Sequence, residues 1–90
     1  MPKYVIERDI PGLGASSPEE LRAVSQKSNA VLDELSPHVK WIQSYVTDDK
    51  MYCVYIADDA ELVREHARRG GFPADRVSQV RTTVDPTTGE

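Results

Sequence analysis

Cysteine, histidine and long apolar runs are scarce in this chain of 90 residues. Its single cysteine excludes an internal disulfide, and no group of cysteines and histidines has the spacing of a structural zinc site. No apolar run is long enough to cross a bilayer, and the N-terminus lacks the charged-then-apolar pattern of a secretory signal. We therefore expect a small cytoplasmic domain.

Positive charge is also limited, with 11 Lys and Arg against 15 Asp and Glu, a net charge of −4. Nucleic acids and anionic membranes bind basic surfaces, so we expect no nucleic-acid partner and no membrane partner. The length fits one domain near the lower size at which a single core is sufficient. We expect that domain over residues 1–85, followed by a frayed polar tail over residues 86–90.

The first half of the chain predicts a strand and a long helix. Residues Lys3–Asp9 are rich in β-formers and end at a Pro-Gly turn. Ser17, Pro18 and Glu20 then form a typical helix start, with an N-cap serine, a proline in the first turn and a glutamate three residues after the cap. Pro37 ends this helix. Its inner stripe consists of Leu21, Val24, Ser28, Val31, Leu32 and Leu35.

The second half predicts a β-hairpin, a shorter helix and a last strand. Two strand-like runs around a short polar link indicate the hairpin. Asp58, with Glu61 three positions on, is the expected N-cap of the second helix, which ends at Gly70-Gly71. The expected strands are Val39–Thr47 and Met51–Ala57, around Asp48–Lys50, and then Val77–Val84.

This order, βαββαβ, is typical of a ferredoxin-like α+β sandwich. Such a fold has a four-stranded antiparallel sheet with both helices on one face. The other face must meet water, a ligand or a second copy of the chain. We expect a homodimer through this uncovered face, in the form of a dimeric α+β barrel.

The hairpin register decides which residues lie on the uncovered face. With a link of three residues, Tyr45 lies opposite Cys53, and both point away from the helices. Aromatic and polar side chains on such a face predict either plain dimer packing or a dimer interface that encloses a small wet pocket. The expected pocket-lining residues are Trp41, Gln43, Tyr45, Tyr55 and Arg81.

Cys53, His66 and Glu7 are the candidate metal ligands. Thiolate and imidazole suit nickel, copper or zinc better than magnesium or calcium, and Glu7 would add an oxygen ligand. The structural alternatives are a small buried hydrophobe for Cys53 and a hydrogen-bonded, half-buried imidazole for His66. Neither histidine has an orienting partner in the sequence, so we assign no catalytic residue.

Two segments, MYCVYIA (51–57) and EHARRGGFPADRV (65–77), resemble a family of small stand-alone bacterial domains. The family, long without a known function, includes nickel-responsive, nickel-binding proteins. The resemblance runs from Lys3 to about Val84. Its most specific pieces are Tyr52-Cys53, His66, Gly71 and Pro73-Ala74-Asp75.

The resemblance implies a ferredoxin-like fold, usually a dimer, and the binding of a transition metal such as nickel. Cys53 and His66 match the pattern of the nickel-binding relatives. Where those relatives carry further histidines, this chain has Arg8, Asp9 and Phe72.

Three functions remain open at this point. The first is a dimeric, non-enzymatic binding protein that holds a transition metal such as nickel through Cys53, His66 and Glu7. The second is an enzyme similar to the dimeric ferredoxin-like monooxygenases and isomerases, which a closed, largely apolar cavity of several hundred Å³ would favour. The third is an interaction module without a small ligand.

Overall fold

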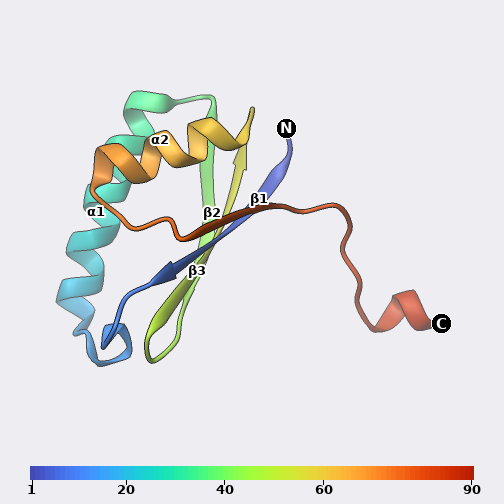
Figure 1. The fold of residues 1–90 in the computed structure, drawn as a ribbon, viewed down its shortest axis with the longest axis horizontal. Helices are drawn as coiled ribbons and strands as arrows, with labels where there is room; N and C mark the ends of the chain where they lie inside the picture. The colour runs from blue at the N-terminus through green and yellow to red at the C-terminus, as the bar shows by residue number, and fades with distance from the viewer.

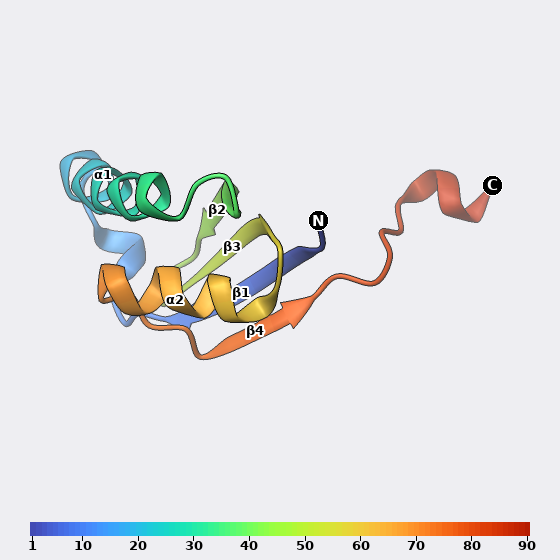
Figure 2. The ribbon, with the colours of Figure 1, turned by 90° about the horizontal axis from the view of Figure 1, so that it is seen from above.

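Both helices lie on one face of a four-stranded antiparallel sheet in the computed structural model, which describes residues 1–90 (Figures 1 and 2). The strands lie in the order β2-β3-β1-β4. The ferredoxin-like arrangement predicted from the sequence is therefore confirmed. The elements are β1 (Lys3–Asp9), η1 (Leu13–Ala15), α1 (Pro18–Leu35), β2 (Val39–Val46), β3 (Lys50–Ala57), α2 (Ala60–Gly70), β4 (Arg76–Gln79) and η2 (Pro86–Gly89).

Helix α1 begins as the sequence predicts. The Glu20 backbone N–H donates to Ser17 Oγ over 3.1 Å, and the Ser17 N–H donates to Glu20 Oε1 over 3.0 Å, which is a complete capping box. The C-terminal part of its apolar stripe is buried at Val31 and Leu35. The N-terminal part is not, because Val24 is 43% exposed.

Helix α2 begins one residue later than expected. Asp59, not Asp58, is its N-cap and accepts from the Leu62 N–H over 2.9 Å. The carboxylate of Asp58 instead contacts His38 Nδ1 at 2.6 Å, so it is not free to cap the helix. The helix ends at Gly70, and its C-cap is Gly71, whose φ of +71° favours glycine.

The predicted hairpin register was wrong by one residue. The Thr47 N–H donates to the Lys50 carbonyl, so the turn has two central residues and not three. Cys53 consequently lies opposite Ser44, and Tyr45 lies opposite Tyr52. Because adjacent residues of a strand point to opposite faces, this shift moves every side chain of β3 to the other face.

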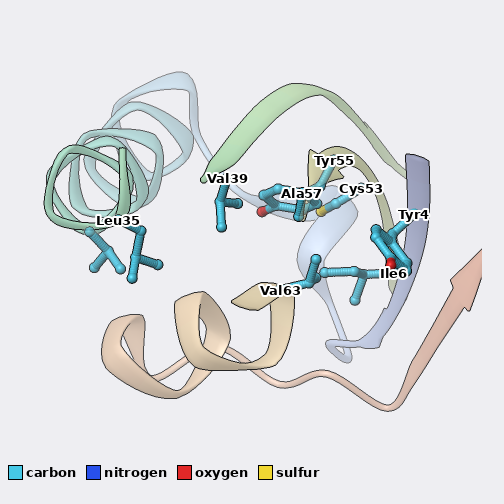
Figure 3. Close-up of a cluster of buried hydrophobic side chains, with 9 residues drawn as sticks. Tyr4, Ile6, Leu35, Val39, Cys53, Tyr55, Ala57 and Val63 are labelled. Carbon is cyan, nitrogen blue, oxygen red and sulfur yellow. The ribbon is translucent and has the colours of Figure 1, made fainter. Parts of the chain in front are cut away.

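Cys53 and Tyr55 therefore face the helices, contrary to the prediction, and they belong to the core drawn in Figure 3. Trp41 points to the same side, because a bulge at Ile42 shifts the register within β2. The uncovered face has a different composition from the one expected. Its large apolar side chains are Val5, Ile42, Tyr45, Tyr52, Val54 and Ile56.

Strand β4 is shorter than the predicted Val77–Val84. Its partner β1 begins at Lys3, whose carbonyl accepts from the Val80 N–H, so there is no strand left for later residues to pair with. The chain then leaves the sheet, and Figure 2 shows it running away from the body. The segment expected to fray holds the short 3₁₀ helix η2, capped by Asp85. No helix in the structure meets the length and apolarity that a membrane crossing requires.

Candidate functional site

A cavity of about 330 Å³ lies between the N-terminal half of α1 and the sheet, and we call it the α1 cavity. Its walls come from β1, the η1 segment, α1, β2 and β3, and Phe72 contributes from the loop after α2. Ten of the 16 lining residues are hydrophobic. The volume lies at the lower end of the range of small-molecule sites.

Small side chains explain why this space is not filled. Three of the four serines that line the cavity, Ser25 and Ser28 on α1 and Ser44 on β2, lie where a large apolar residue would complete the core. Leu21 and Val24 of the α1 stripe line the cavity and are not buried against the sheet. The apolar stripe of α1 therefore packs tightly against the rest of the core only over the C-terminal half of the helix.

Arg8 is the charged residue buried at this cavity. It is 3% exposed because it shares the inward face of β1 with Tyr4 and Ile6. Its Nε donates to Cys53 Sγ over 3.5 Å, and its Nη2 donates to Tyr55 Oη over 3.3 Å. A third hydrogen bond runs from Nη1 to the Pro73 carbonyl.

Phe72 reaches this place because α2 ends in two glycines. The Phe72 N–H donates to the Ala67 carbonyl over 2.9 Å, which folds the chain back beneath the helix. A Cβ at Gly70 would overlap the Phe72 ring. The ring lies 5.6 Å from the Arg8 guanidinium carbon, within cation–π range, and 5.7 Å from the His66 ring.

His66 is fully buried beside the cavity. Its Nε2 lies 3.0 Å from Ser28 Oγ, whereas its Nδ1 has no hydrogen-bond partner. Burial and the nearby positive charge of Arg8 lower the pKa of His66 from 6.5 to about 4. The imidazole is therefore neutral at pH 7.

Tyr55 also keeps its proton. Desolvation raises the pKa of its hydroxyl to about 12, although the positive charge of Arg8 acts to lower this pKa. The phenol accepts a hydrogen bond from Arg8, so its own O–H can donate to a further acceptor.

The structure separates the residues that the sequence suggested as pocket lining. Trp41 and Tyr55 do line a cavity, but it is on the helix side of the sheet. Gln43 and Tyr45 lie on the uncovered face, where Tyr45 is 56% exposed. Arg81 follows the end of β4, is exposed and borders no cavity.

The three candidate metal ligands are not brought together either. Cys53 and His66 lie on the helix side, but Glu7 points to the other face, where its carboxylate is 3.8 Å from Arg76. No group of three or more His, Cys, Asp or Glu side chains could hold a metal ion. Although His66 Nδ1 is unpartnered, the Cys53 sulfur accepts from the Arg8 cation, and that positive charge opposes a second cation at Cys53. This residue set does not fit nickel within one protomer.

Arg8 and Phe72 were identified in the sequence only as departures from the nickel-binding pattern. The alternation of Tyr4, Ile6 and Arg8 contains the signal that places Arg8 inward. No comparable signal predicts that Phe72 folds back beneath α2, because that depends on the turn at Gly71.

The strand order defines this chain as a ferredoxin-like domain, and a largely apolar cavity that is partly open to solvent lies beneath α1. Residues 4–80 match the family described as nickel responsive protein SCO4226-like, and the chain belongs to that family. The crystal structure of SCO4226 from Streptomyces coelicolor A3(2) resembles it with a TM-score of 0.76 at 20% identity, covering 91% of this chain and 99% of that chain. That likeness shows the fold. No curated protein matches the sequence.

Proposed function

We propose that this chain is a small dimeric binding protein whose ligand site is the α1 cavity. The observation that carries this proposal is the cavity itself. Apolar side chains left partly unpacked around an open cavity of this size weaken the core of a domain of only 90 residues. A bound ligand would restore the missing contacts.

Binding is favoured over catalysis by the state of the nearby ionisable groups. A general acid or base works best with a pKa near the operating pH. The pKa of His66 is lowered to about 4 and that of Tyr55 is raised to about 12, so neither exchanges a proton readily at pH 7. Neither of these two groups therefore supports the enzyme alternative.

The uncovered face supports a homodimer. Cross-strand neighbours such as Val5 and Val54, and Tyr45 and Tyr52, form an apolar and aromatic surface on one side of the sheet. Such a patch is typical of a protein interface. The α1 cavity lies on the opposite side of the sheet, so each protomer of a dimer would keep its own site.

Titration with the neutral, apolar dye N-phenyl-1-naphthylamine tests the cavity. We expect dye emission excited through Trp41, the only tryptophan, because its ring lines the cavity. Ser25→Met places a flexible apolar side chain in the space and should weaken dye binding at least tenfold. Gln26→Met, the matched change on the exposed side of α1, should leave binding unchanged. Equal binding by both variants would contradict the proposed site.

The dimer is tested by sedimentation velocity on Val54→Lys. A lysine at the centre of the uncovered face should convert a dimer to a folded monomer, because the charge would be buried without a partner. Val84→Lys, at a valine that is 73% exposed in the C-terminal segment, is the matched control. A monomeric wild type would overturn the dimer.

Nickel is the second candidate ligand, supported by family membership and the unpartnered His66 Nδ1. Titration calorimetry with NiCl₂ on wild type, Cys53→Ala and His66→Ala separates the two candidates. The separation of Cys53 and His66 from Glu7 leads us to expect no nickel binding that depends on Cys53 or His66. Loss of tight nickel binding in either variant would instead favour the metal.

A further inference from the structure

No carboxylate forms an ion pair with Arg8. The guanidinium is buried and carries a positive charge. Arg8 takes part in none of the six ion pairs of the structure. Glu20 is the one carboxylate on the cavity lining, but it is exposed and accepts from the Ser17 N–H. A buried cation without a counter-ion is unfavourable, so its retention calls for an explanation.

Neutral groups nevertheless hold the guanidinium in place at the cavity. Tyr55 Oη, Cys53 Sγ and the Pro73 carbonyl occupy three of its five N–H groups, and the Phe72 ring lies within cation–π range. The remaining N–H groups have no protein acceptor. Fixed guanidinium donors of this kind suit the two oxygens of a carboxylate.

The rest of the cavity suits an apolar body and not a bare inorganic ion. Its volume of about 330 Å³ far exceeds the ~30 Å³ of one water molecule. Leu21, Val24 and Trp41 provide apolar walls. A small anion at Arg8 would leave most of this surface uncovered.

We infer that the α1 cavity binds an organic monocarboxylate with an apolar body. The carboxylate pairs with Arg8 and accepts a second hydrogen bond from the Tyr55 hydroxyl, while the body packs beneath α1. The inference rests on the proposed function, because it names the ligand class of the same cavity.

Calorimetric titration with octanoate, 1-octanol and octylamine tests the inference, since these compounds share one alkyl chain. We expect octanoate to bind at least tenfold more tightly than 1-octanol, and octylamine not to bind, because its cation would face Arg8. From hexanoate to octanoate, affinity should rise about fourfold per methylene as the apolar walls are covered. Equal binding of octanoate and 1-octanol by the wild type would overturn the inference.

Variants at Arg8 test whether this residue causes the preference for octanoate over 1-octanol. Arg8→Met should bind octanoate and 1-octanol equally, and Arg8→Lys should keep part of the preference. An undiminished preference in folded Arg8→Met would overturn the inference. If Arg8→Met does not fold, the wild-type titrations with octanoate and 1-octanol still decide whether the cavity prefers a carboxylate. Dye binding without octanoate binding would refute the inference and leave the proposed function intact, whereas failure of the dye to bind would refute the proposed function.

Discussion

Replacing Arg8 by methionine tests whether this arginine serves stability or ligand binding. Methionine is long, uncharged and flexible enough to occupy the same space. The variant loses three hydrogen bonds, and bonds from a charged donor contribute about 1.5–3 kcal/mol each. It also removes a buried charge whose desolvation costs several kcal/mol. The two effects oppose each other and are of similar size.

We therefore expect Arg8→Met to change the free energy of unfolding of the ligand-free protein by less than about 2 kcal/mol. An arginine kept for stability would cost about 3–5 kcal/mol when removed, as happens when a satisfied buried ion pair is broken. Urea unfolding followed by far-UV circular dichroism gives the midpoint and the m-value. Arg22→Met, at an exposed arginine of α1, is the matched control. If the free energy of unfolding instead falls by about 3 kcal/mol or more at constant m-value, as it does when a buried ion pair is broken, the reasoning is refuted.

Two further predictions concern the groups around Arg8. Burial gives His66 a pKa of about 4 in the folded protein, against the usual 6.5. As the pH falls from 7 to 5, the unfolded chain therefore binds a proton at His66 while the folded protein does not, which favours unfolding. In urea unfolding, the free energy of unfolding of the wild type should fall by about 2 kcal/mol more than that of His66→Gln over this range, and equal losses would contradict the neutral buried imidazole. Gly70→Ala should destabilise the protein by about 1–3 kcal/mol in the same assay, because its methyl group overlaps the Phe72 ring. An unchanged midpoint of urea unfolding would contradict this prediction, because it would mean that the Phe72 ring can adopt another position without loss of stability.

The sequence predicted the fold well because its signals are local. The Ser17 capping box and the apolar stripe of α1 depend on residues within a few turns of each other. The end of α2 likewise follows from Gly70-Gly71. Errors arose where a boundary depends on another element, as in β4, which stops where β1 has no further residues to pair with.

The site could not be predicted to the same extent, because one residue in the hairpin turn decides it. Counting Lys50 in the link shifts the register by one and places Cys53 and Tyr55 on the wrong face. The α1 cavity depends on serines from different elements facing one another, which no local pattern reveals. The inward position of Arg8 was readable from alternation, but its lack of a carboxylate partner is visible only in the structure.

The most direct test of the central claim is a crystal structure of the wild type with 8-bromooctanoate, in which anomalous scattering locates the bromine. The account predicts a carboxylate against the Arg8 guanidinium and a bromine peak beneath α1, near Leu21 or Val24. A bromine peak on the uncovered face, near Tyr45 or Val54, would contradict it. So would a crystal at saturating ligand in which the α1 cavity contains only water.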